Sequence, residues 1–194
     1  MSLIRSESFR ANVLCVDLDK TLTQKDVFRT ALLNWFRRGF RPFCGRPPLN
    51  RNDFKDWVYQ NVDLTTIDWR FNQEVIDLIV NSKKVSVKII LVTGNSPTAA
   101  NFFADKLAIF DLALASTSYN ILKGEDKASA LLSIYGEKTF DYVGDSRSDL
   151  KVWAVANHAF VLKNKNLLFK VIVHALKKKQ ISFTVLNRGH VSFH

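Results

Sequence analysis

The sequence predicts an α/β protein in which a parallel sheet is flanked by helices and a small helical insert follows the first strand. Three observations lead to this fold class. Short apolar segments alternate with amphipathic ones, which is the pattern of a parallel sheet covered on both faces. Clusters of polar residues follow several apolar segments directly, where ligands bind in open sheets of this kind. Roughly seventy residues without a convincing strand interrupt the alternation after the first apolar segment.

Five segments are predicted as strands because they are almost entirely apolar and too short to be buried helices. In chain order they cover residues 12–17, 87–92, 112–116, 140–144 and 158–162. A further segment, "ISFTVLN" at 181–187, is a candidate for a last strand. Because helical patterns separate the later strands, we expect βαβ units and therefore a parallel sheet.

Helices are expected between these strands. The segment 96–110 begins with Ser96 and Pro97, a cap residue followed by a proline, which is typical of a helix start. The segment 124–136 ends at Gly136, a residue favoured just beyond the last turn of a helix. Two more amphipathic patterns predict helices at 147–157 and 164–180.

The interruption after the first strand is predicted to be a helical insert. Amphipathic patterns at 26–40 and 51–62 flank the Pro- and Gly-rich loop "RPFCGRPPLN", and a third at 71–84 leads back to the second strand. We therefore expect residues 24–75 to form a helical cap over the sheet, and residues 1–23 and 76–194 to form the core.

The net charge of +10 is unevenly distributed. Residues 151–194 contain no Asp or Glu and carry eight positive charges: Lys151, Lys163, Lys165, Lys170, Lys177, Lys178, Lys179 and Arg188. Basic faces attract anionic partners, although a solvated basic surface explains them equally well. The predicted helix at 164–180 is also amphipathic, so it could lie on an anionic membrane surface instead of packing on the sheet.

Composition narrows the class of protein and its location. The mean hydropathy of −0.04 is ordinary for a globular protein, and no apolar run reaches the ~20 residues that span a bilayer. The first ten residues lack the apolar core of an export signal. The two cysteines, Cys15 and Cys44, make no disulfide framework, and Cys15 is expected to be a core residue. We expect a cytoplasmic protein, with association at a membrane surface as the alternative.

Four clusters of polar residues are expected at one edge of the sheet. Three of them follow predicted strands, and one lies at the start of a predicted helix. "VDLDKTLT" puts Asp17 and Asp19 at the end of the first strand, and "LVTGNS" puts Thr93, Gly94 and Asn95 after the second. "DYVGDSRSD" puts Asp145 and Asp149 after the fourth strand, and "ILKGEDK" offers Lys123 and Lys127 around a helix start. The carboxyl ends of parallel strands meet at one edge, so these clusters should converge there.

The chemistry of the combined cluster favours phosphoryl transfer. Asp17, Asp145 and Asp149 offer hard oxygen ligands of the kind that Mg²⁺ prefers. A metal ion there would relieve the repulsion between the close carboxylates and assist attack on a phosphate. Asp17 could then attack phosphorus, while Asp19 protonates the leaving oxygen and later activates water.

Three further groups are candidates for holding the phosphoryl group. The Thr93 hydroxyl and the Gly94 amide could bind phosphate oxygens at the end of the second strand. Lys123 could neutralise the charge that develops during transfer, and Lys127 could reach the same space.

The segments "DLDKTLT", "LVTGNS", "ILKG" and "VGDSRSD" resemble, in order, the four motifs of the haloacid dehalogenase-like (HAD) hydrolase superfamily. The resemblance covers the chain from about Asn12 to Leu162. It implies a Rossmann-like core with strand order 3-2-1-4-5, dependence on Mg²⁺ and an aspartyl-phosphate intermediate. The presence of a second aspartate in the first motif favours phosphate chemistry over dehalogenation.

The resemblance also implies a role for each matched residue. Asp17 looks like the nucleophile and Asp19 like the general acid/base. The Asp17 carboxylate, the Asp19 main-chain carbonyl and Asp145 look like the metal ligands. Thr93, Gly94, Asn95 and Lys123 look like the phosphate-binding residues, with Lys127 left open as the alternative lysine.

Within the superfamily, the chain is most similar to phosphoserine-phosphatase-like members with a helical type-1 cap, and to the HAD domain found ahead of membrane prenyltransferases. This implies a phosphatase acting on a small or prenyl-linked phosphomonoester. A phosphomutase would use the same residues, and a basic binding module with a vestigial site is an alternative from another class. Nucleic acid is not expected as a partner, and the sequence predicts no oligomeric state.

Overall fold

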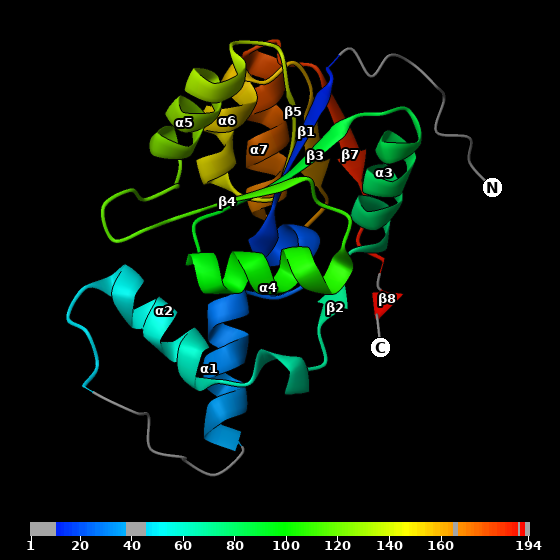
Figure 1. Ribbon diagram of the computed structural model, residues 1–194. Helices are drawn as coiled ribbons and strands as arrows, with labels where there is room; N and C mark the ends of the chain where they lie inside the picture. The colour runs from blue at the N-terminus through cyan, green and yellow to red at the C-terminus, as the bar shows by residue number, and fades with distance from the viewer. Residues whose placement is uncertain (1–10, 38–45, 165–166, 190, 193–194) are drawn as a thin grey trace.

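The computed structural model describes residues 11–37, 46–164, 167–189 and 191–192. Its centre is a six-stranded parallel sheet with the strand order β4-β3-β1-β5-β6-β7 (Figure 1). The strands are β1 (Val13–Asp17), β3 (Lys88–Thr93), β4 (Leu112–Ala115), β5 (Asp141–Gly144), β6 (Ala159–Leu162) and β7 (Phe183–Leu186). The predicted fold class is confirmed. The five expected strands follow the order 3-2-1-4-5, and the candidate last strand, β7, extends the sheet beyond them.

Helices cover both faces of the sheet (Figure 1). They are α3 (Gln73–Lys84), α4 (Pro97–Leu107), α5 (Glu125–Tyr135), α6 (Leu150–Val155) and α7 (Leu167–Lys178). One apolar cluster joins β-strand residues such as Leu14 and Leu91 to Ile79 of α3 and Phe103 of α4. A second cluster, on the opposite face, joins Cys15 and Ile90 to residues of α5, α6 and α7. Because neighbouring strand residues enter different clusters, the sheet is buried on both sides, as its apolar strands require.

Two helix ends lie where their residues predict. Helix α4 has Pro97 as its first residue and Ser96 just before it, although the Ser96 side chain makes no capping hydrogen bond. Helix α5 ends at Tyr135 and is followed by Gly136. The φ of Gly136 is 90°, which favours a residue without a Cβ, and its N–H bonds to the Leu132 carbonyl oxygen. Cys15 is fully buried, and burial raises the pKa of its thiol far above the usual value.

A pair of helices, α1 (Val27–Arg37) and α2 (Arg51–Asn61), lies beyond the carboxyl end of β1 (Figure 1). The pair buries Val27, Ala31, Val58 and Tyr59, and it shares its core with α3 and α4. An aromatic group between the two helices includes edge-to-face contacts of Phe28 with both Phe54 and Tyr59. The connecting residues 38–45 lie outside the described part of the chain.

A second, small sheet contradicts the expectation that residues 24–75 contain no strand. Strand β2 (Arg70–Phe71) pairs antiparallel with β8 (Val191–Ser192). Two-residue strands have no detectable periodicity, so pattern analysis could not find them. The residues before β8 lie against the start of α3, because Asn187 bonds through its N–H and its amide group to the Glu74 carboxylate. The end of the described chain therefore returns to the carboxyl edge of the main sheet.

Asp141, the first residue of β5, is a buried carboxyl group whose effect on stability can be measured. It is 2% exposed, its Oδ1 accepts a 2.8 Å hydrogen bond from Asn157 Nδ2, and burial raises its pKa to about 6. The folded state therefore binds this proton more tightly than the unfolded state, and stability is lost as the pH rises from about 4 to 6. Asp141→Asn removes the buried charge and should raise the unfolding free energy by about 1–2 kcal/mol at pH 7.5. Thermal unfolding of both proteins at pH 4.5 and pH 7.5 checks this, since the gain should shrink at the lower pH.

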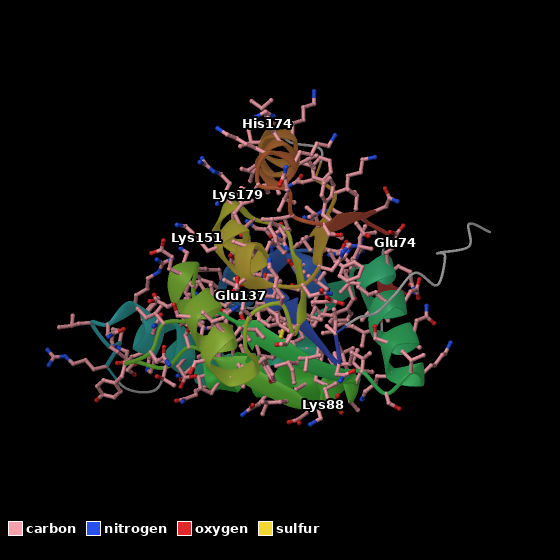
Figure 2. The ribbon with its side chains drawn as sticks, turned by 90° about the horizontal axis from the view of Figure 1, so that it is seen from above. Glu74, Lys88, Glu137, Lys151, His174 and Lys179 are labelled. Atoms are coloured by element: carbon pink, nitrogen blue, oxygen red, sulfur yellow. The ribbon has the colours of Figure 1, made fainter. Side chains whose placement is uncertain are left out.

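Helix α7 lies on the outside of the molecule. It packs through Ile172 and Leu176, while Figure 2 shows His174 on its outer side, directed away from the sheet. Leu167 is 75% exposed and lies near exposed lysines of the same helix. Among the described helices, none is long and apolar enough to cross a membrane.

Candidate active site

The carboxyl ends of three adjacent strands define the candidate site. Asp17 is the last residue of β1, Thr93 is the last residue of β3, and Asp145 directly follows β5. Strand β1 lies between β3 and β5, with Asp17 opposite Val92 and Val16 opposite Val143. The parallel register therefore brings the three polar side chains to one edge, as the sequence predicted.

Asp17 forms a buried ion pair with Lys127 of α5. Lys127 Nζ lies 2.6 Å from Asp17 Oδ1, and the two side chains are 6% and 13% exposed. The ammonium also donates to the Tyr142 hydroxyl at 3.0 Å and to the Val92 carbonyl oxygen at 3.4 Å. All three donors of the lysine are thus used, which compensates for its burial. Burial alone would lower the pKa of Lys127, but Asp17 and Asp149 hold it above the usual value.

A chain of hydrogen bonds continues from the lysine to Asp149. The Tyr142 hydroxyl donates to Asp149 Oδ1 at 3.0 Å, and Ser146 donates to Asp149 Oδ2 through its N–H and its hydroxyl, at 2.9 and 2.6 Å. Gly144 leaves room for this carboxylate, because a Cβ there would lie 2.8 Å from Asp149 Cγ. Asp149 therefore holds the lysine through tyrosine, while its other oxygen caps the turn after β5.

Burial dominates the electrostatics of Asp17. It raises the pKa of Asp17 to about 7, although Lys127 works in the opposite direction. Asp149 and Asp19 raise it further because they place like charges nearby. Burial makes the negative charge of this carboxylate unfavourable. Forming a bond to an electrophile or binding a cation would therefore stabilise the side chain.

Asp145 has a partner from the far end of the described chain. Arg188 Nη2 lies 3.0 Å from Asp145 Oδ2, and Arg188 Nε donates to the Lys163 carbonyl oxygen. Burial and Asp149 raise the pKa of Asp145 to about 6, with Arg188 opposing them. The segment that connects β7 to β8 therefore supplies a guanidinium to the site.

Asp19 belongs to a hydrogen-bond network separate from that of Asp17. The chain turns between Leu18 and Leu22, where Asp19 is extended and Lys20 adopts a left-handed conformation with φ of 58°. Asp19 Oδ1 accepts the Val27 N–H at 2.7 Å, and Asp19 Oδ2 accepts Asn95 Nδ2 at 2.7 Å. Burial is the largest influence on Asp19 and raises its pKa, which favours the protonated acid.

The segment after β3 offers groups for an anion. Thr93 Oγ1 accepts the Asn95 N–H at 3.0 Å, so its own proton points elsewhere. Gly94 is tightly enclosed, because a Cβ would meet the Leu122 carbonyl oxygen at 3.2 Å. Ser96 Oγ is buried at the start of α4 with no hydrogen-bond partner in the described structure. An unpaired buried hydroxyl costs about 1–3 kcal/mol, which a ligand oxygen would recover.

The residues at this edge suit a magnesium ion by their chemistry. Asp17 and Asp145 supply two buried carboxylates from neighbouring strands, and burial raises the pKa of both, so a cation would stabilise their charged forms. No group of three or more His, Cys, Asp or Glu side chains in the described ranges is arranged as a metal cage. Mg²⁺ is commonly held by only one or two carboxylates, with water and substrate phosphate completing its shell.

The two candidate lysines, Lys123 and Lys127, lie in different surroundings in the structure. Lys127 lies against Asp17, whereas Lys123 is exposed in the loop before α5. A signal for this choice existed, because Lys127 falls one helical turn before the buried Leu131 and therefore on the inner face of its helix. Sequence reasoning missed Tyr142 and Arg188. The first could have been suspected, since a tyrosine in a buried strand normally finds a hydrogen-bond partner.

The chain shares the fold of a known class of protein, the HAD-family hydrolases. A predicted phosphoglycolate phosphatase from Haemophilus somnus 129PT superimposes with a TM-score of 0.60 at 16% sequence identity, covering 89% of this chain and 93% of that one. Phosphoserine phosphatase with bound substrate superimposes with a TM-score of 0.53, also at 16% identity, covering 91% and 93%.

Sequence comparison adds one curated relative. Uncharacterized protein y4nM of Sinorhizobium fredii is 27% identical over 161 residues, which cover 83% of this chain. The chain spans 28% of the length of that relative. No protein-family profile matches the sequence.

Proposed function

We propose that the chain is a Mg²⁺-dependent HAD-type phosphatase that hydrolyses a phosphomonoester through an aspartyl-phosphate intermediate. The observation that carries the proposal is the buried Asp17 at the end of β1, paired with Lys127 at 2.6 Å. Two residues further on, Asp19 is a second buried carboxyl group with a raised pKa. A nucleophile, a fixed positive charge and an acid at one sheet edge are the groups that phosphoryl transfer needs.

In the first step, an Asp17 carboxylate oxygen bonds to phosphorus as the ester P–O bond breaks. Asp19 gives its proton to the leaving oxygen, so the products are an alcohol, an acyl phosphate on Asp17 and the Asp19 carboxylate. Lys127, which we assign the role predicted for Lys123, faces Asp17 and offsets the negative charge that gathers there.

In the second step, water attacks the phosphorus of the acyl phosphate and Asp19 takes a proton from that water. The P–O bond to Asp17 breaks, which releases inorganic phosphate and restores both aspartates. Thr93, Gly94 and Asn95 lie on the side of the site next to β3, where the phosphoryl oxygens would bind.

Mg²⁺ would be held by the carboxylates of Asp17 and Asp145 and by the Asp19 carbonyl, and it would neutralise phosphate charge. In the structure Asp145 bonds to Arg188, so the Arg188 side chain lies beside this proposed metal site.

Residues 24–75 would act as the cap of this enzyme. Their helix pair lies over the carboxyl end of β1, and its Lys55 and Tyr59 reach the site through Asn95. The aromatic side chains of the pair, which include Phe28, Phe54 and Trp57, support a substrate with a small or prenyl-linked leaving group.

The outer face of α7 is the candidate contact with an anionic membrane surface. Its support is the exposed Leu167, Leu168 and Val171 beside exposed lysines. Cosedimentation with anionic liposomes should fall when Leu167 and Val171 are both replaced by serine. Equal cosedimentation of the wild type and this double variant, or binding to neutral liposomes alone, would contradict the proposed membrane contact. A cytoplasmic location remains our expectation.

The proposed function is tested by screening the purified protein against phosphoserine, sugar phosphates, nucleotides, prenyl phosphates and 4-nitrophenyl phosphate. Hydrolysis should require Mg²⁺, stop in excess chelator and return when Mg²⁺ is restored. Full activity in chelator would exclude the metal, and transfer of phosphate to another position of the substrate would indicate a mutase. A binding module would hydrolyse nothing in the panel.

A further inference from the structure

The acid/base candidate Asp19 is connected to the helix pair by a hydrogen-bonded chain of three side chains. The Tyr59 hydroxyl bonds to Asn95 Oδ1 at 2.9 Å, and Asn95 Nδ2 bonds to Asp19 Oδ2 at 2.7 Å. Tyr59 belongs to α2, Asn95 to the turn after β3, and Asp19 to the turn after β1. Three separate parts of the sequence therefore converge on one carboxyl group.

From this chain we infer that Tyr59 and Asn95 are positioning residues, which hold the Asp19 carboxyl group in the orientation for protonating the leaving oxygen. This inference rests on the proposed function and deepens it. It gives Asn95 a role toward Asp19 in place of direct contact with the substrate, because both ends of its amide group already have protein partners.

The orientation of the Asn95 amide follows from its neighbours. Lys55 Nζ lies 3.3 Å from one end of the amide and can only donate, so that end must be the oxygen. The other end is therefore the NH₂ group, which can only donate, and it faces the Asp19 carboxylate. The Tyr59 hydroxyl then donates to the oxygen together with Lys55. A flipped amide would leave the ammonium facing a donor and the carboxylate facing an acceptor.

The chain is also rigid. Asn95 is fully buried and Tyr59 is 3% exposed. The Asn95 backbone is held by its N–H, which bonds to Thr93 Oγ1, and by its carbonyl oxygen, which accepts the Ser116 N–H at 2.9 Å. Burial raises the pKa of the Tyr59 hydroxyl far above its usual value, so it stays a donor at all working pH values. Buried groups with every partner in place hold a single geometry.

Both oxygens of Asp19 depend on the helix pair. Oδ1 accepts the N–H of Val27, the first residue of α1, and Oδ2 is held through Asn95 by α2. A movement of the pair relative to the sheet would therefore change the orientation of the acid. The Tyr59 link therefore makes the orientation of the acid depend on the position of the helix pair.

The consequence is a dependence on the leaving group. An alkoxide is a poor leaving group and needs a proton as it departs, whereas 4-nitrophenolate leaves readily as an anion. Loss of the acid's orientation should therefore slow the hydrolysis of an alkyl phosphate more than that of an aryl phosphate. A general loss of folded protein or of phosphate binding would slow both esters equally.

The experiment compares kcat/KM for 4-nitrophenyl phosphate with that for the best alkyl phosphate of the screen, because kcat/KM reports on P–O cleavage. Tyr59→Phe removes only the hydroxyl and should lower the alkyl value at least about tenfold, but the aryl value less than about threefold. Asn95→Ala removes the middle member of the same chain and should show the same preference. Asp19→Asn should show it most strongly, and Tyr135→Phe is the matched control on the other face of the sheet.

Equal losses on both esters in Tyr59→Phe and Asn95→Ala, or wild-type values in both, would overturn the inference while leaving the phosphatase intact. A wild-type protein that hydrolyses no ester would overturn the proposed function and the inference with it. Thermal unfolding of each variant shows that the comparison is made between folded proteins.

Discussion

Asp17→Asn should abolish turnover, with a loss of at least about 1,000-fold in kcat, because an amide cannot form the acyl phosphate. The variant should remain folded, since the asparagine oxygen can still accept the Lys127 hydrogen bond at the position of Oδ1. It also removes the charged partner of the buried Lys127 ammonium, so the unfolding free energy should fall, while the hydrogen bonds of that ammonium to Tyr142 and Val92 limit the loss. Hydrolysis of the best substrate and thermal unfolding, measured on the same preparation, check both parts.

A second measurement connects the loss of activity to the covalent step. Asp19→Asn should slow release of the phosphoryl group from Asp17, so intact-mass spectrometry during turnover should detect the phosphorylated protein. The double variant that also carries Asp17→Asn should never gain this mass. Activity near the wild-type level in Asp17→Asn would end the case for this nucleophile.

Lys127→Met should be nearly as damaging to activity and should also destabilise the protein. Methionine keeps the length of the side chain but leaves Asp17 buried without its partner, which costs about 3 kcal/mol in comparable pairs. Without the lysine the pKa of Asp17 should rise further above about 7, so the stability deficit should grow as the pH rises beyond that value. We expect kcat/KM to fall at least about 100-fold.

Lys123→Met is the matched control for this prediction. It removes the same charge four residues away, from an exposed position in the loop before α5. Its activity should stay within about threefold of wild type, because Lys123 is exposed and the buried partner of Asp17 is Lys127. If Lys123→Met lost activity and Lys127→Met kept it, the roles of the two lysines would have to be exchanged.

The main sheet could be predicted because each strand is a short apolar run with clear ends. The run that ends at Asp17 is apolar up to its last residue, so the position of the carboxylate and the end of β1 follow from the same pattern. The small sheet of β2 and β8 could not be predicted in this way. Its pairing joins Phe71 to Val191 across more than half of the chain, and nothing local specifies it.

The position of the candidate site could be predicted from the strand ends, but its contacts could not. Asp17, Thr93 and Asp145 were expected at one edge because parallel strands place their ends together, and the structure places them there. The bonds of Asn95 depend on Tyr59, 36 residues away, and on Asp19, 76 residues away. Such partners are chosen by the packing of the helix pair on the sheet, which a single sequence does not encode as a local pattern.

The pairing of Arg188 with Asp145 means that this carboxylate already has a counter-ion belonging to the chain itself. A divalent cation that takes Asp145 Oδ2 as a ligand would therefore have to displace a guanidinium of the same chain. The apparent affinity for the cation would equal the intrinsic affinity multiplied by the fraction of molecules in which Arg188 does not bond to Asp145. A movement of residues 187–189, which are also fixed to Glu74, would thus change the apparent affinity for the Mg²⁺ ion proposed here.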